Sequence, residues 1–351
     1  MNYNVGLFSE GDSYYSTFYP IVQEFIDRRQ EIIYFTLDKN DKILEIDSPF
    51  LKNKFLGNKF FSILNFYFID VDNLISTTPN IGCKNYPYRK PFKVKNLIHI
   101  FHSVSDISIY RVGSLDYYDS VFLTGNFQKK SILELESKRK TIKKKLVCVG
   151  APYLDYLIHN KLDIKNTDKI NTVLIASSWG TKGCLENYGS SFIKKIAKKY
   201  KVILRPHPYS LIFEKDKIEY LKKELKETNI IWDFEIDPSS SMSIADILIS
   251  DTSSIRFDFS LVYNKPVITL SVDSNMMSGY ERECLDYDWI KETDHTFWPI
   301  VDQTSIKEIN NKIEDVLLKF NKDYNMSKFE KLICNFGESA KSLVDRIEEI
   351  I

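Results

Sequence analysis

The stretch that decides the fold of this chain is Ile247-Leu-Ile-Ser-Asp-Thr-Ser-Ser-Ile-Arg-Phe-Asp-Phe-Ser-Leu-Val-Tyr-Asn-Lys-Pro-Val-Ile-Thr-Leu270. The apolar run Ile247–Ser250 predicts a strand, Ser253–Val262 predicts a helix, and Pro266–Leu270 predicts a second strand. A strand, a helix and a further strand in this order form the unit from which parallel sheets are built.

The corner between this first strand and its helix is a candidate anion site. It carries Asp251, Thr252, Ser253 and Ser254. Small hydroxyl residues favour a helix N-terminus, and the backbone N–H groups there suit a diphosphate. Ligands of open α/β sheets bind at such corners. The alternative is an ordinary helix cap without a ligand.

The same alternation extends along the 351 residues in both directions. Short apolar runs alternate with amphipathic helical stretches, which predicts an α/β protein with two halves of similar size. We expect an N-terminal domain over residues 1–160 and a second domain over 161–327. Residues 328–351 are expected to form a final helix that packs back on the first domain.

Two further strand ends in the second half carry candidate donor-binding residues. A predicted strand runs into Arg205, and His207 follows it between two prolines, so a phosphate contact and a rigid turn are equally good interpretations. Ser177 and Trp179 begin a polar loop after the first strand of this half. An ordinary polar connection is an equally good interpretation of that loop.

The first half offers a candidate general base. His102 lies at the end of a predicted strand, where it could accept the proton of an attacking hydroxyl, and Asp106 could orient it. Ser9 and Asp12 lie in a loop at the first strand, where an acceptor could enter. A histidine in this setting is more often structural.

Charge excludes one class of function and leaves another open. The chain has 48 Lys and Arg against 48 Asp and Glu, so its formal net charge is zero, which argues against a nucleic-acid-binding protein. Residues 84–95 and 138–145 are nevertheless rich in Lys and Arg and contain no acid. These two segments could contact an anionic membrane surface or a polyanionic acceptor. A solvated surface is the plainer interpretation.

No apolar run approaches the length of a membrane span, and the N-terminus lacks the features of a signal peptide. Five scattered cysteines without a C-x-x-C pair indicate reduced thiols, and no metal or cofactor motif is present. We therefore expect a cytoplasmic protein, peripheral at most on the inner face of the membrane, without a cofactor and without a metal cluster evident in the sequence.

Taken in order, several stretches resemble the CDP-glycerol glycerophosphotransferase family, whose members build teichoic-acid and related capsule polymers. The most specific match is Ile249–Phe259 followed by Asn264–Ile268, which is similar to the family's Asp-Tyr-Ser-Ser and Lys-Pro signature. The other matching stretches are Phe101–Ser103, Leu115–Asn126, Gly150–Pro152, Ala176–Trp179 and Leu204–Pro208.

The resemblance implies a GT-B fold, in which two Rossmann-like domains face a cleft and the C-terminal domain binds the nucleotide. It implies that His102 is the base, that His207 contacts the donor phosphate, and that Ser253 and Ser254 hold the diphosphate. The chain departs from the family where a glycine should follow His102 and where Thr252 replaces a tyrosine. The family's nearby basic residue is displaced to Arg111.

We therefore expect a transferase that moves a polyol phosphate from a CDP-linked donor to a hydroxyl of a lipid-linked or polymeric glycan. A GT-B glycosyltransferase using a UDP- or CMP-sugar is the main alternative. A UDP-sugar 2-epimerase and a non-catalytic binding protein on the same scaffold are more distant ones.

Overall fold

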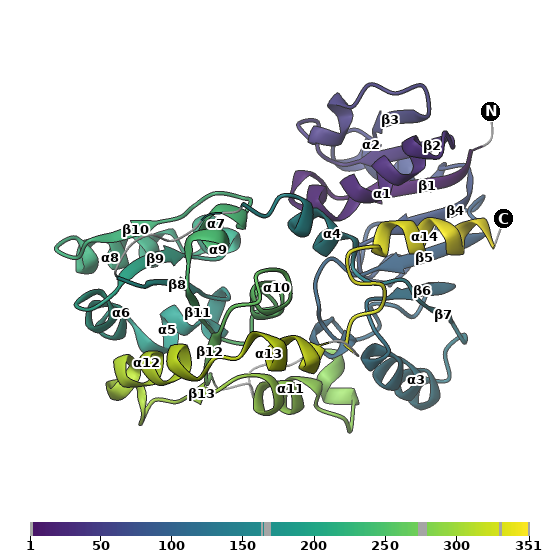
Figure 1. The fold of residues 1–351 in the computed structure, drawn as a ribbon. Helices are drawn as coiled ribbons and strands as arrows, with labels where there is room; N and C mark the ends of the chain where they lie inside the picture. The colour runs from purple at the N-terminus through teal and green to yellow at the C-terminus, as the bar shows by residue number, and fades with distance from the viewer. Residues whose placement is uncertain (1–2, 163, 165–169, 273–278, 330–331, 350–351) are drawn as a thin grey trace. The chain divides into compact units, whose positions relative to one another are not determined.

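A computed structural model describes residues 3–162, 164, 170–272, 279–329 and 332–349. Its strands form two separate parallel sheets, and the chain divides into two units (Figure 1). Unit 1 comprises Met1–His159, Gly279–Tyr287 and Lys331–Ile351. Unit 2 comprises Asn160–Ser278 and Asp288–Glu330.

Unit 1 is built on a seven-stranded sheet in the order β3-β2-β1-β4-β5-β6-β7. Its strands are β1 (Tyr3–Ser9), β2 (Ile32–Thr36), β3 (Leu51–Phe55), β4 (Val71–Ser76), β5 (Asn96–Ile100), β6 (Ser120–Leu123) and β7 (Lys145–Cys148). Its α-helices are α1 (Tyr15–Asp27), α2 (Lys59–Tyr67), α3 (Phe127–Arg139), α4 (Pro152–His159) and α14 (Ser339–Glu348). Its 3₁₀ helices are η1 (Asp12–Tyr14), η2 (Lys42–Glu45), η3 (Ile107–Ile109) and η5 (Glu281–Cys284).

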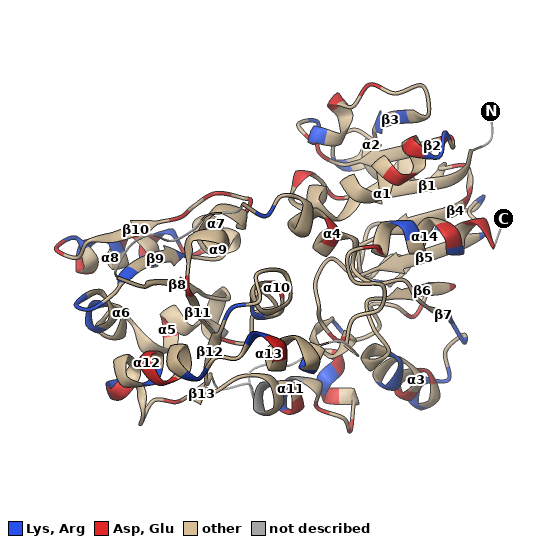
Figure 2. Ribbon diagram, viewed as in Figure 1, with Lys and Arg blue, Asp and Glu red and all other residues tan. Residues whose placement is uncertain are grey.

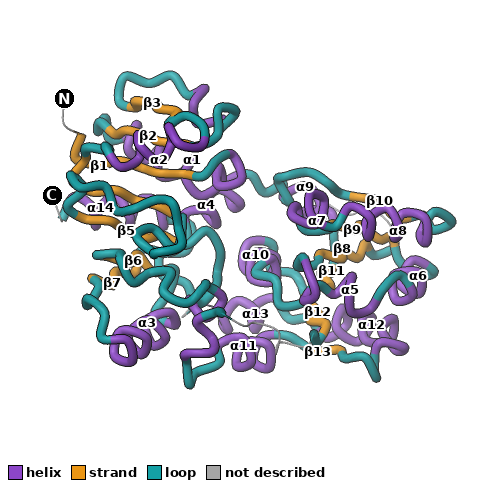
Figure 3. Tube along the Cα trace, turned by 180° about the vertical axis from the view of Figure 1, so that it is seen from behind, coloured by secondary structure: helices purple, strands orange, loops and turns teal. Residues whose placement is uncertain are grey.

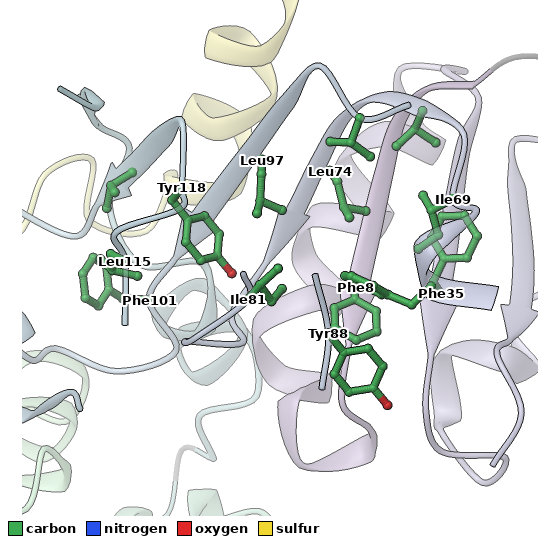
Figure 4. Packing of buried hydrophobic residues seen from close by; sticks show 14 of the residues in the cluster. Phe8, Phe35, Ile69, Leu74, Ile81, Tyr88, Leu97, Phe101, Leu115 and Tyr118 are labelled. Atoms are coloured by element: carbon green, nitrogen blue, oxygen red, sulfur yellow. The ribbon is translucent and has the colours of Figure 1, made fainter. Parts of the chain in front are cut away.

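Both faces of this sheet are buried, because the strands are apolar at successive positions rather than at alternate ones. Val5 and Leu7 pack with α1 and α14 on one face, whereas Phe8 packs on the other face with residues of α2 and α3. Figure 4 shows this second face, where Phe8, Leu74 and Leu97 come from three adjacent strands. The helices that cover the sheet are seen from behind in Figure 3.

Unit 2 is built on a six-stranded sheet in the order β10-β9-β8-β11-β12-β13. Its strands are β8 (Thr172–Ala176), β9 (Lys201–Arg205), β10 (Ile230–Trp232), β11 (Ile247–Ser250), β12 (Val267–Leu270) and β13 (Ile300–Val301). Its α-helices are α5 (Cys184–Tyr188), α6 (Ser191–Ala197), α7 (Pro208–Phe213), α8 (Lys215–Leu225), α9 (Ser239–Ile244), α10 (Ile255–Val262), α11 (Trp289–Phe297), α12 (Ile309–Lys319) and α13 (Lys322–Phe329). Two 3₁₀ helices, η4 (Gly180–Lys182) and η6 (Ile306–Glu308), complete it.

Both sheets place their first strand beside their fourth. The chain runs outward from β8 through β9 to β10, then returns to the other side of β8 at β11. This is the strand order of a Rossmann-like sheet, and ligands bind in the crevice where the order reverses. The strand order reverses between β1 and β4 in unit 1 and between β8 and β11 in unit 2.

The C-terminal part of the chain differs from the single helix expected over residues 328–351. Helix α13 ends at Phe329 and α14 begins only at Ser339, while described residues between them form turns. Asn335 and Gly337 adopt positive φ angles, which an α-helix does not permit. Helix α14 packs against α1 within unit 1.

A second segment far along the chain, Gly279–Tyr287, also belongs to unit 1. Glu281 of η5 is fully buried and accepts two hydrogen bonds of 2.8 Å from the Arg139 guanidinium. It also accepts one of 2.9 Å from the backbone N–H of Gly113. Burial raises the pKa of Glu281 although Arg139 opposes that shift. Residues 279–287 are thus tied to the first sheet although they follow most of unit 2 in sequence.

Candidate functional site

The centre of the site in unit 2 is Asp251, which comes directly after β11. Its carboxylate is fully buried and accepts hydrogen bonds from the N–H of Ser178 at 2.9 Å and from that of Cys184 at 2.7 Å. It also accepts from the Ser178 hydroxyl at 2.6 Å and from the N–H of Ser253 at 3.1 Å. Asp251 therefore joins the loop after β8 to the loop after β11, at the point where the strand order reverses.

The loop after β8 is shaped to fit this carboxylate. Ser177 is buried, and its hydroxyl donates to Asp251 at 3.1 Å. A Cβ added to Gly183 would lie 2.3 Å from the carbonyl oxygen of Ser178, so only glycine fits there. We expected Asp251 and Ser177 to bind the donor directly. In the structure both side chains instead face each other and hold the two loops in place.

The hydroxyl residues of the corner remain accessible. Thr252, Ser253 and Ser254 are half-buried, and the hydroxyls of Thr252 and Ser254 have no hydrogen-bond partner among the described residues. Helix α10 begins at Ile255, and its first amides already bond to Ser253 and Ser254. The hydroxyl groups of Thr252 and Ser254 are thus available to an anionic ligand.

Sequence reasoning missed Arg256, in the first turn of α10. Its guanidinium is buried, donates to the Ser253 carbonyl oxygen at 3.0 Å and to the Thr269 hydroxyl at 2.9 Å, and lies 4.5 Å from the Trp298 ring centroid. These contacts fix the backbone at Ser253. A basic residue in the first turn of the quoted helix was the available signal.

Arg205, predicted to contact a donor phosphate, has several protein partners in the structure. The guanidinium is buried and donates to the Asp233 carboxylate at 2.6 Å and to the carbonyl oxygens of Glu235 and Ile236 at 2.7 and 2.9 Å. Its donors therefore point at the loop that follows β10. Arg205 is a structural residue that holds this loop against the end of β9.

Loss of Arg205 should destabilise unit 2 without weakening donor binding. In R205M, Asp233 would keep a buried negative charge without its cation, which costs about 3–5 kcal/mol of unfolding free energy. Burial raises the pKa of Asp233, but Ser241 and Arg205 together hold it below its usual value. The contribution of Arg205 is therefore present near neutral pH and is lost as the pH falls through that lowered pKa. Urea unfolding at pH 7 and at pH 3 measures both effects, and a donor Kd that rises in the folded variant would contradict the structural role.

His207 is placed as a hydrogen-bond donor. It caps helix α7, and its Nδ1 accepts from the N–H of Tyr209 at 3.1 Å. Burial lowers the pKa of His207, so the ring is neutral at physiological pH and the bonding assigns its proton to Nε2. The half-buried ring thus offers an N–H from the end of β9. Trp179, which is 45% exposed, lies edge-on to Tyr209 with ring centroids 5.4 Å apart.

In unit 1, His102 follows β5 and is half-buried. Burial lowers its pKa to about 4, so the imidazole is neutral at physiological pH. Its Nδ1 has no hydrogen-bond partner among the described residues, and the ring lies edge-on to Tyr14 with centroids 5.2 Å apart. Neighbouring His99 is fully buried, bonds to the Tyr110 hydroxyl at 3.2 Å and has a pKa lowered to about 3, which makes it a core residue.

Asp106 does not orient His102. Its carboxylate caps the 3₁₀ helix η3 by accepting from the N–H of Ser108 at 2.9 Å. Burial raises its pKa to about 6. Within the described residues the structure shows no hydrogen bond between Asp106 and His102, so the expected dyad is not formed.

The three residues expected on the acceptor side have local partners. The Ser9 hydroxyl is buried and closes a turn with the backbone of Gly11 at 3.1 Å. Asp12 accepts from the N–H of Lys42 at 3.2 Å and pairs with its ammonium at 3.4 Å. The Arg111 guanidinium lies 4.3 Å from the centroid of the Tyr280 ring. These contacts shape the loops at this end of unit 1.

Glu10 is a carboxylate that is linked to His102 through Tyr14. The sequence analysis did not single it out. Glu10 accepts from the Tyr86 hydroxyl at 2.6 Å and from the Tyr14 hydroxyl at 3.5 Å, and Tyr14 in turn packs on His102. Burial and the Glu10 carboxylate raise the pKa of Tyr86, which keeps this phenol protonated. The signal available in the sequence was the polar loop that follows β1.

The two basic segments carry less free charge than their sequences indicate. Acids from neighbouring elements pair with three of the five cations in 84–95 and with three of the six in 138–145. The pairs are Lys90 with Asp119, Lys93 with Asp70, Lys95 with Asp72, Lys138 with Glu134 and Asp286, Arg139 with Asp116 and Glu281, and Lys144 with Glu136. Figure 2 shows acidic and basic residues interleaved in both units.

Among the described residues, no group of three or more His, Cys, Asp or Glu side chains is arranged to hold a metal ion. In the same part of the chain, no helix has the length and apolar character needed to cross a membrane.

Comparison with known proteins gives one family match. A family model described as CDP-Glycerol:Poly(glycerophosphate) glycerophosphotransferase matches residues 112–349. The matched range includes the candidate residues of unit 2 and begins after His102 and Asp106. No protein in the curated collections matches the chain.

Several solved structures share the fold. The wall teichoic acid polymerase TagF, in a crystal soaked with CDPG, is 13% identical with a TM-score of 0.62 and covers 99% of this chain and 88% of its own. A putative UDP-N-acetylglucosamine 2-epimerase from Listeria monocytogenes is 10% identical with a TM-score of 0.64, covering 100% and 96%. HepE from Anabaena, in complex with UDP-glucose, is 12% identical with a TM-score of 0.54, covering 97% and 99%. At these identities the likeness shows the fold, and together with the two parallel sheets it establishes a GT-B fold.

Proposed function

The chain belongs to the CDP-glycerol:poly(glycerophosphate) glycerophosphotransferase family, and we propose that it transfers a polyol phosphate from a CDP-linked donor to a hydroxyl of a teichoic-acid-like or other surface polysaccharide. The observation that carries this proposal is the Asp251 junction. It holds the loops after β8 and β11 together where the strand order reverses and leaves the hydroxyls of the corner accessible.

The reaction needs positioning and charge stabilisation more than covalent help from the protein. The acceptor oxygen forms a bond to the phosphorus that carries the polyol, the bond from that phosphorus to the bridging oxygen breaks, and CMP leaves with the electron pair. We propose that Thr252, Ser253 and Ser254 donate hydrogen bonds to the diphosphate. The Nε2–H of His207 would stabilise the charge that develops on the leaving CMP.

His102 is our candidate for the base that accepts the proton of the acceptor hydroxyl. Support comes from its neutral ring and from its half-buried place directly after β5. We assign no direct role to Asp106, and the acceptor-side roles of Ser9, Asp12 and Arg111 are limited to shaping the loops. The acceptor itself is proposed to be polymeric or lipid-linked, with the enzyme working at the inner face of the membrane.

A donor panel tests this function. Purified full-length chain is incubated with CDP-glycerol, CDP-ribitol, UDP-glucose or CMP-sialic acid together with a poly(glycerophosphate) acceptor. We expect release of CMP and lengthening of the acceptor with a CDP-polyol alone. Turnover of a nucleotide sugar instead would make the chain a glycosyltransferase. Absence of nucleotide binding by calorimetry would leave a non-catalytic scaffold.

Two substitutions at His207 separate its role in donor binding from its role as a helix cap. In H207N the side-chain oxygen can still accept from the N–H of Tyr209, whereas the outward N–H is lost. H207A loses both. We expect each variant to weaken CDP-glycerol binding about 10-fold or more, the value of a hydrogen bond to a charged group, while H207A alone also lowers the melting temperature. An unchanged Kd in H207N would remove His207 from the donor site.

A further inference from the structure

Helix α2 in unit 1 exposes four large apolar side chains to solvent, which are Phe60, Phe61, Leu64 and Tyr67. Of its nine residues, Ser62 and Phe66 are buried, and Phe66 packs against Phe8 with ring centroids 4.5 Å apart. Phe60 and Phe61 are 70% and 68% exposed. This is the reverse of a surface helix that hides its apolar face.

The exposed apolar surface extends beyond the helix. Phe68 follows α2 and is 57% exposed, and Phe92 reaches the same place from the segment before β5 and is 56% exposed. Their ring centroids are 5.9 Å apart, and the ring of Tyr67 lies 5.6 Å from that of Phe92. We call this set the aromatic patch; its members are Phe60, Phe61, Leu64, Tyr67, Phe68 and Phe92.

Single exposed apolar side chains are ordinary, but a group of six from two adjoining segments marks an interaction site. The segments that form the patch are also basic. Residues 51–68 contain three lysines and no acid, and residues 84–95 contain five Lys or Arg and no acid. Although acids from elsewhere pair with some of these cations, Lys54, Lys59 and Lys84 are exposed and have no carboxylate partner among the described residues.

This charge decides between two possible occupants. A second copy of the chain packed on the same patch would bring each set of lysines near its own counterpart, because a two-fold interface is self-complementary. Like charges facing each other oppose such a contact. An anionic lipid surface, in contrast, attracts the lysines and accepts the rings.

We propose that the aromatic patch inserts into the headgroup region of an anionic membrane and holds unit 1 there as a peripheral protein. Aromatic rings favour this region because it accepts an apolar body beside polar groups, and nearby lysines bind anionic lipid. The contact places the anchor on α2 and Phe92, rather than on the basic segments alone. It depends only on the surface of unit 1 and not on the proposed function.

Vesicle binding by the full chain tests the proposal. We expect the protein to sediment with vesicles of equal phosphatidylglycerol and phosphatidylcholine, and much less with phosphatidylcholine alone. F60S/F61S should weaken binding to the anionic vesicles on the order of 10-fold or more, since two large apolar groups are lost from the contact. The matched control is L318S/Y324S, two exposed apolar residues of unit 2, which should bind as the wild type does.

The charge component is tested separately. K59E should lower binding and its sensitivity to salt, whereas K307E, at an exposed lysine of unit 2, should not. All variants should keep the wild-type melting temperature and the same CMP release with a soluble acceptor, so a failure of the anchor is distinguishable from a failure of the function. Equal binding by wild type and F60S/F61S would overturn the proposal. So would concentration-dependent dimerisation that F60S/F61S abolishes in the absence of lipid.

Discussion

H102A is expected to lower kcat for glycerol phosphate transfer by roughly 10²–10⁴-fold, the range of a lost general base, while the Kd for CDP-glycerol stays unchanged. The reason is that the donor is assigned to residues of unit 2, whereas His102 belongs to unit 1. Single-turnover measurement of CMP release with saturating acceptor, together with calorimetry of the donor, checks both parts.

The pH profile adds an independent readout. Burial lowers the pKa of His102 to about 4, so the ring stays neutral, and able to accept a proton, at every pH well above that value. Wild-type kcat should therefore not decline between pH 8 and pH 5.5 through protonation of this group, and should decline as the pH approaches 4. H159A, at an exposed histidine of α4, is the matched control. If H102A turns over at the wild-type rate, the base lies elsewhere, and Glu10 beside Tyr14 is the next residue to substitute.

D251A is expected to cause a large loss of stability. It leaves the buried N–H of Cys184 and the half-buried N–H groups of Ser178 and Ser253 without their acceptor, at a cost of about 3–5 kcal/mol. Because these bonds position both loops, donor binding should be lost as well, even at temperatures where the variant remains folded. Urea unfolding followed by calorimetry with CDP-glycerol measures the two effects.

Two companion variants sharpen this prediction. D251N keeps the shape and one accepting oxygen, so it should lose less stability than D251A while still binding the donor poorly. D216N, at an exposed carboxylate of α8, should leave both quantities unchanged. A D251N variant with wild-type affinity for the donor would show that the loops need only the volume of this side chain and not its charge.

Local patterns in the sequence were sufficient for the architecture. Short apolar runs alternating with amphipathic stretches predicted two parallel α/β halves, and the structure confirms two parallel sheets of a GT-B fold. The predicted strand at Ile247–Ser250 is β11 as it stands. The final helix was wrong in extent, because periodicity in 328–351 does not reveal the positive φ angles at Asn335 and Gly337 that interrupt it.

Such local patterns do not predict which residues distant in the sequence become hydrogen-bond or ion-pair partners. Arg205 has the side-chain chemistry of a phosphate-binding residue, but it forms an ion pair with Asp233, which lies 28 residues later in the sequence. Asp251 lies at the predicted corner between strand and helix. Its hydrogen bonds to Ser178 and Ser177, 73 and 74 positions earlier, show that it holds the two loops of the site together. The sequence shows that residues 84–95 contain no acid. Their ion pairs with Asp70, Asp72 and Asp119 form because the order of the strands brings these acids close.

The sequence by itself determined which residues stand at the ends of strands, because strand and helix periodicity are local properties of the chain. It thereby located His102, His207 and the corner Asp251–Ser254. Only the tertiary structure decided which of these side chains are already satisfied by the fold and which remain available, and it alone exposed the rings of α2. The physical reason is that a buried polar or charged group must find its partner across the sheet, and strand order, not sequence distance, brings that partner near.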